Sequence, residues 1–233
     1  MKRQLKAMLS FFTADMRYSY YIFWTVLSAI ILLSLGLTYL FSEETTIFNG
    51  VSISVYVYGA ILGFKTVKET LPFSLKMGGT RKNYFVSIGL YFAGVSILSA
   101  IIESALHYLT TSITKTFSIN LTLLHPAALL NQEDSFFYRF AADFVILFYL
   151  LTFFFIMGLI FYKYNIAVGF SVIGLIILAL IGTAADGVLI ELVKKIVIEA
   201  SFTHYFATFG ISIIMYMVSW LLLYNISAKS ISS

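Results

Sequence analysis

The hydrophobic pattern of this chain consists of six long stretches that contain no Asp, Glu, Lys or Arg. They cover residues 18–42, 45–64, 83–102, 144–162, 164–185 and 200–228. A helix rises about 1.5 Å per residue, so roughly 20 apolar residues cross the hydrocarbon layer of a bilayer, which is about 30 Å thick. Each stretch is therefore long enough to be a membrane span. The expected fold class is an all-α integral membrane protein with six transmembrane helices.

Where these stretches meet charged or turn-forming residues, we expect the spans to begin and end. The expected spans are 18–41, 47–64, 83–108, 140–161, 166–182 and 202–224, within a single transmembrane domain over residues 1–233. Composition favours the same class, because 60% of the residues are hydrophobic and only 11% are charged. An average soluble domain is about 25% charged. The chain has no cysteines, which excludes disulfide bonds, thiolate metal sites and a cysteine nucleophile.

The distribution of charge predicts the orientation of the spans. With six spans and the N-terminus in the cytoplasm, eleven of the fifteen basic residues face the cytoplasm, and nine of the eleven acidic residues lie on or near the outer side. Basic residues in short loops stay in the cytoplasm, so this bias favours an N-in, C-in topology. No soluble basic domain is present to carry nucleic-acid binding, and nucleic acid is not an expected partner.

Two segments outside the spans have an amphipathic pattern. Residues 1–17 place apolar side chains, including Met8 and Phe12, at helical spacing beside basic residues. This pattern predicts a helix on the inner membrane surface, in contact with lipid; the alternative is a plain cytoplasmic leader. Residues 183–203 mix apolar residues at helical spacing with five charges, which predicts an amphipathic helix at the outer interface.

The loop between the second and third spans contains the signals of a short helix. Residues 65–85 read K-T-V-K-E-T-L-P-F-S-L-K-M-G-G-T-R-K-N-Y-F. Thr70 is suited to cap the start of a helix and Pro72 to occupy its first turn. Gly78 or Gly79 can end the helix in a left-handed conformation, and Thr80 can cap the third span.

This predicted helix would present a row of apolar side chains to the cytoplasm: Leu71, Phe73, Leu75 and Met77. Such a row favours a protein partner or the membrane surface; the alternative is an ordinary basic loop with a glycine turn. The glycines do not form a phosphate-binding loop, which needs G-x-x-x-x-G-K-[ST] after a strand. ATP hydrolysis by this chain itself is therefore not expected, and we do not expect it to be an enzyme.

These features together resemble those of a known family. The six spans, the basic amphipathic N-terminus and the short helix after the second span resemble the permease subunits of type-2 ABC exporters. The run L-P-F-S-L-K-M-G-G-T-R-K-N-Y-F is similar to a segment of small bacterial members, which has an apolar residue, Pro and Phe followed by Gly-x-Thr-Arg-x-x-Tyr. The resemblance covers the whole chain as architecture and about 15 residues as local sequence.

The resemblance implies that the 71–77 helix is a coupling helix that docks on a separate ATP-binding subunit. The resemblance also implies a second permease subunit, identical or paralogous, which would complete the translocation path for the cargo. The membrane would be a bacterial plasma membrane. ATP would bind the partner, and this chain would hold no cofactor. The implied contact residues are Leu71, Phe73, Leu75, Met77, Thr80 and Arg81.

Uncharged, aromatic-rich span centres suit an amphipathic or apolar cargo such as a peptide, lipid or drug, because a small ion would need charge within the membrane. Two alternatives stay open. One is a membrane scaffold, immunity or sensor protein with no transport path. The other is an intramembrane enzyme that uses Glu103 or His107.

A few polar residues near the ends of the spans are further candidates. Glu103 and His107 share one face of the third span, and we expect them near the outer interface. One carboxylate and one histidine are too few ligands for a closed metal site. Arg139 and Asp143, also four residues apart, predict a salt bridge at the outer surface. His125 and His204 are isolated in the sequence, which favours structural roles.

Overall fold

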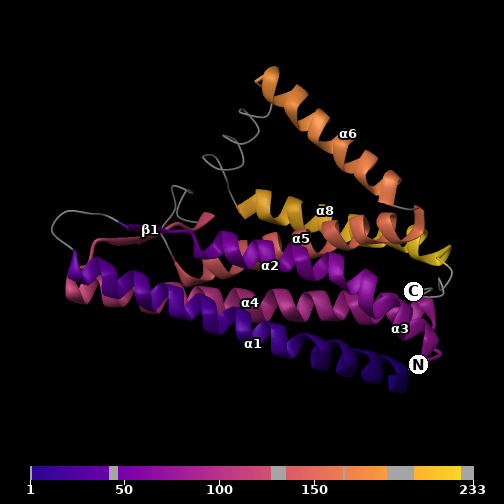
Figure 1. The fold of residues 1–233 in the computed structure, drawn as a ribbon, viewed down its shortest axis with the longest axis horizontal. Coiled ribbons are helices and arrows are strands. Elements are labelled where there is room, and N and C mark those ends of the chain that lie inside the picture. Colours follow the sequence, from indigo (N-terminus) through magenta and orange to yellow (C-terminus); the bar gives the residue numbers. More distant parts are fainter. Residues whose placement is uncertain (1, 42–46, 127–134, 165, 188–201, 227–233) are drawn as a thin grey trace.

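The computed structural model describes residues 2–41, 47–126, 135–164, 166–187 and 202–226, and these are almost entirely helical (Figure 1). The elements are α1 (Lys2–Leu40), β1 (Ile47–Asn49), α2 (Val51–Lys65), a π-helical segment (Thr66–Thr70), α3 (Leu71–Lys76), α4 (Arg81–Phe117), β2 (Leu121–Leu123), α5 (Phe136–Tyr164), α6 (Ile166–Ala185) and α8 (Phe202–Tyr224).

Five of these helices are long and apolar enough to cross a membrane: α1, α4, α5, α6 and α8. Their outward faces carry many exposed large apolar side chains, which suit contact with lipid. The predicted class, an all-α membrane protein, agrees with these helices. The second expected span differs, because α2 has only 15 residues, about 22 Å at helical rise, and residues 47–49 form a strand instead.

Helix α5 lies at the centre of the bundle and packs against α2, α4 and α8 (Figure 1). Its contact with α2 is unusually close. A Cβ atom added at Gly63 would lie 2.5 Å from the backbone oxygen of Leu151, and one at Gly59 would lie 3.0 Å from the Leu147 side chain. Small residues allow helices to approach this closely in a membrane. The two glycines therefore allow the close packing of α2 on α5.

Residues 2–17 do not form a separate surface helix. Helix α1 continues without a break from Lys2 to Leu40. The side chains of Met8, Phe12 and Met16 are buried in the core of the protein, where Phe12 meets Tyr84 edge to face. The amphipathic face that predicted contact with the membrane surface therefore covers other helices.

A small parallel sheet lies at one end of the bundle and was not predicted, because residues 47–49 were expected to begin the second span and residues 121–123 to lie between two spans. Ile47 of β1 pairs with Leu121 of β2, and Asn49 pairs with Leu123. The strand β2 follows α4, which runs to Phe117, beyond the expected end of that span, and stops where Ser118 adopts a left-handed conformation with φ of 52°. This end of the bundle is called the sheet end below.

The opposite end, called the α3 end, contains α3, the start of α1 and α4, and the end of α8 (Figure 1). The Arg81 side chain donates a 2.9 Å hydrogen bond from Nε to the backbone oxygen of Ile226, which joins α4 to the residues after α8. Helix α6 packs mainly against α5 and leans away from the other helices (Figure 1). Most of the outer helix predicted over 183–203 lies outside the described residues.

The close approach of α2 and α5 predicts an asymmetric effect of two glycine substitutions. Gly63→Ala places a methyl group against the Leu151 backbone, and such overpacking costs about 1–3 kcal/mol. Gly36→Ala in α1 meets nothing within 4 Å and improves helix propensity by up to about 1 kcal/mol. The thermal stability of each variant is measured as the fraction of purified protein that stays monodisperse after heating. Equal thermal stability of the two variants would contradict the close contact.

Candidate functional site

The segment 70–81 at the α3 end is the first candidate region. Gly78 adopts a left-handed conformation with φ of 77°, and the Thr80 hydroxyl accepts a 3.2 Å hydrogen bond from the Asn83 backbone N–H at the start of α4. Pro72 stands in the first turn of α3. These three predictions are confirmed.

Thr70 does not cap α3 as predicted. Its backbone is helical, because the π-helical segment joins α2 to α3 without an interruption. Its hydroxyl donates a 2.5 Å hydrogen bond to the Thr66 carbonyl, one helical turn earlier. The short helix is therefore a continuous extension of α2 rather than a separate helix in a loop.

The four apolar residues of α3 are not presented together. Leu71 is completely buried and Leu75 is half-buried, so the expectation that both face outward is wrong for Leu71. Phe73 and Met77 are exposed, with 43% and 74% of their surfaces accessible. The Phe73 ring stacks on Phe11 of α1 at 4.3 Å between centroids, and the two rings line a shallow apolar groove between α1 and α3. Phe73 and Met77 remain available for contact from outside.

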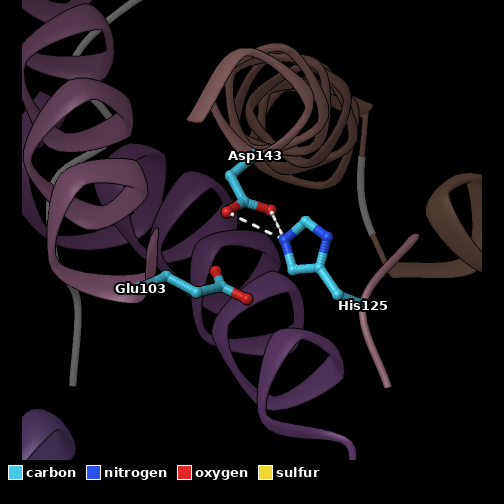
Figure 2. Close-up of side chains that lie close together, drawn as sticks. All are labelled: Glu103, His125 and Asp143. Carbon is cyan, nitrogen blue, oxygen red and sulfur yellow. Dashed lines mark hydrogen bonds and ion pairs between the residues drawn. The ribbon is translucent and has the colours of Figure 1, made fainter. Parts of the chain in front are cut away.

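The second candidate region is a buried polar cluster near the sheet end, formed by Tyr56, Glu103, His125 and Asp143. Glu103 lies on α4, Asp143 on α5, and His125 on the segment after β2 (Figure 2). The His125 Nε2 atom lies 3.0 Å and 3.2 Å from the two Asp143 carboxylate oxygens. The Tyr56 hydroxyl of α2 donates a 2.7 Å hydrogen bond to Asp143 Oδ1. Three segments of the chain, α2, α5 and the segment after β2, thus meet at the Asp143 carboxylate.

The sheet carries His125 to this position. Asn49 of β1 donates a hydrogen bond of 3.0 Å from its side chain to the Ser34 hydroxyl of α1, and its backbone oxygen accepts one of 2.9 Å from the Leu124 N–H. These bonds hold the residues after β2 against the helices. His125 follows directly, and its side chain is buried together with that of Asp143.

Glu103 completes the cluster from α4. Only 2% of its surface is accessible, and among the described residues neither carboxylate oxygen makes a hydrogen bond of normal geometry, although the Ser52 hydroxyl of α2 lies nearby. Its carboxylate points toward His125 and Asp143 (Figure 2). A buried carboxylate without hydrogen bonds is costly unless a proton or a cation compensates it.

Sequence analysis did not predict that these polar residues would be buried together. Glu103 and His107 were expected as interfacial polar residues, and the structure shows that both side chains are buried inside the protein. Arg139 and Asp143 were expected as a surface pair, yet both are buried, and the Asp143 carboxylate binds His125 and Tyr56. His125 is far from isolated, because its ring also meets that of His107 edge to face at 5.6 Å.

The cluster has the donors of a cation or proton site, namely two carboxylates and an imidazole. No family model matches this chain, and no match was found among curated proteins or solved structures. Its function is therefore inferred from the chemistry of the two candidate regions.

The hydrogen bond from Tyr56 to the Asp143 carboxylate predicts a measurable loss of stability when it is removed. Tyr56→Phe keeps the ring and deletes only the donor, and a hydrogen bond to a charged group is worth about 1.5–3 kcal/mol. Tyr18→Phe is the matched control, because 75% of the Tyr18 surface is exposed and such surface changes stay within about 0.5 kcal/mol. Thermal unfolding in detergent should rank Tyr56→Phe well below both the control and the unmodified chain; equal values would contradict the bond.

Proposed function

We propose that this chain is the transmembrane permease subunit of an ATP-driven exporter, which works with a separate ATP-binding subunit and a second permease subunit. The observation that carries this proposal is the short helix α3, which is anchored in the bundle and still exposes Phe73 and Met77 at one end. A coupling helix needs both properties, since it must bind a partner and pass on the partner's movement.

The anchoring of α3 supports this role in mechanical terms. Leu71 and Ser74 are buried on its inner face. The Tyr84 hydroxyl of α4 donates a 3.1 Å hydrogen bond to the Thr66 carbonyl at the start of the π-helical segment. Because α2, this segment and α3 are continuous, a displacement of α3 moves α2 with it. A flexible loop would absorb such a displacement instead.

The charge distribution supports a cytoplasmic α3 end. Five basic residues lie in or beside α3 and at the start of α4: Lys65, Lys68, Lys76, Arg81 and Lys82. Basic residues of this kind remain on the cytoplasmic side of a plasma membrane. The start of α1 and the end of α8 lie at the same end (Figure 1). The proposed topology therefore has both chain ends in the cytoplasm. The proposed membrane is the bacterial plasma membrane.

An aromatic groove between α5 and α6 supports an amphipathic or apolar cargo. It is lined by Phe153, Phe154 and Phe161 of α5, by Phe170 of α6 and by Phe64 of α2, together with methionine and isoleucine side chains. Such a surface fits a lipid, a hydrophobic peptide or a drug-like molecule better than an ion.

The proposed orientation predicts the labelling of single cysteines, for which the chain is well suited because it contains none. Met77→Cys at the α3 end and Phe117→Cys at the sheet end replace residues that are 74% and 61% exposed. In intact cells a membrane-impermeant maleimide should label Phe117→Cys, and should label Met77→Cys only after the membrane is opened. The reverse order would overturn the orientation.

Docking through α3 predicts that a charge there separates the permease from its ATPase. When the chain is purified from its native membrane, ATPase activity should copurify. Phe73→Asp and Met77→Asp should each lower this activity at least about tenfold, equivalent to about 1.4 kcal/mol of binding free energy, because a carboxylate would be buried without a partner. Leu75 is less suitable, because its half-buried side chain also supports the fold.

The matched control is Phe117→Asp, which adds the same charge to an exposed phenylalanine at the opposite end. It should retain the copurified ATPase, and all three variants should elute as the folded chain does in detergent. If both α3 variants keep the ATPase, the coupling role is wrong. If the unmodified chain brings no ATPase, a non-transporting scaffold, immunity or sensor protein becomes the better proposal.

A further inference from the structure

The polar cluster brings three metal-binding side chains together from distant parts of the sequence. Glu103, His125 and Asp143 each offer one ligand atom, and these atoms all lie within 4.8 Å of one another (Figure 2). Two ligands of a tetrahedral zinc ion, at bonds of about 2.0–2.2 Å, are about 3.3–3.6 Å apart. The contact between His125 Nε2 and Asp143, at 3.0–3.2 Å, is already close to this spacing.

The carboxylate of Glu103 is a second, independent sign of a ligand. Only 2% of its surface is accessible. The Ser52 hydroxyl lies nearby, but neither Glu103 oxygen makes a hydrogen bond of normal geometry to the described residues. Native proteins rarely bury a polar side chain in this way without a water, an ion or another group to satisfy it. The Glu103 carboxylate points toward His125 and Asp143, so a candidate ion site lies between the three side chains (Figure 2).

The charges of these side chains also favour a cation between Glu103 and Asp143. Two carboxylates lie side by side in a buried environment, where like charges repel strongly. Arg139, one helical turn before Asp143 on α5, is buried and can offset one negative charge. A divalent cation between Glu103 and Asp143 would compensate both carboxylates directly and give the Glu103 oxygens a partner.

We infer that Glu103, His125 and Asp143 bind a divalent transition-metal ion of the Zn²⁺ class. The imidazole favours such an ion over Mg²⁺ or Ca²⁺, which prefer shells of six or more oxygen ligands. The ion binds His125 through Nε2, so the neutral imidazole then carries its proton on Nδ1. Tyr56 remains hydrogen-bonded to Asp143 and orients this carboxylate, as outer partners of metal ligands commonly do.

The ion would act as a structural tie, because its ligands come from α4, α5 and the segment after β2. It would close the sheet end of the bundle and hold these three segments in one arrangement. This role is independent of the exporter proposal, since it needs neither an ATPase nor a cargo.

The test measures metal binding directly on the full chain, purified with a tag free of histidine and stripped with a chelator. Zn²⁺ should bind with one ion per chain, and Co²⁺ should give the absorption bands of a site with four or five ligands. Thermal unfolding should shift to a higher temperature with Zn²⁺, because an ion that binds only the folded state stabilises it.

The variants Glu103→Gln and Asp143→Asn keep the shape of each side chain and remove its charge. Changes to outer partners of a metal site weaken binding about 10–100-fold, so losing a direct ligand should weaken Zn²⁺ binding by about 100-fold or more. Glu69→Gln is the matched control, as Glu69 is exposed and pairs with Lys65 at the other end. It should bind Zn²⁺ as the unmodified chain does.

Two outcomes would overturn the site. In one, the folded, unmodified chain fails to bind a stoichiometric ion or to gain thermal stability with Zn²⁺. In the other, Glu103→Gln and Asp143→Asn bind Zn²⁺ as tightly as Glu69→Gln. Because the first outcome uses the unmodified chain, it does not depend on whether the variants fold.

Discussion

The close approach of α2 and α5 is the contact on which the rest of the structure depends. Gly63 faces the backbone of Leu151, and Gly158 of α5 faces Val67 and the carbonyl of Phe64 in return. In a bilayer, apolar side chains gain little by leaving lipid, so helices associate through such close packing and through buried polar contacts. Helix α2 continues into α3, and α5 carries Asp143. This one contact therefore sets the positions of both candidate regions.

The features that could be predicted from the sequence are those with local causes. Long uncharged stretches predicted membrane helices because hydrocarbon demands them, and α8 spans the expected residues 202–224. The capping by Thr80 depends on a residue three positions away, and the left-handed conformation of Gly78 depends on its own lack of a side chain. Gly59 and Gly63 are four residues apart on one helix face, a local pattern that suits the close packing of α2 on α5.

The features that could not be predicted depend on contacts between distant residues. Asp143 is 18 residues from His125 and 87 from Tyr56, and their meeting requires the pairing of two three-residue strands that have no clear pattern of their own. Leu71 was expected outside because α3 was taken as a separate loop helix. The continuous π-helical connection rotates Leu71 into the core instead.

The positions of the two regions limit how the proposed exporter can move. Glu103 follows Arg81 by 22 residues on α4, about 33 Å at helical rise, so the polar cluster lies roughly one membrane thickness from the α3 end and leaves the span centres uncharged. The Tyr56–Asp143 bond joins α2 to α5 near the sheet end, and the glycine contacts join the same two helices closer to α3. A force applied to α3 should therefore move α2 and α5 as one body. The cargo path of the proposed exporter must then open and close where packing is weaker. One such place is α6, which packs mainly against α5; the other is the boundary between the two proposed permease subunits.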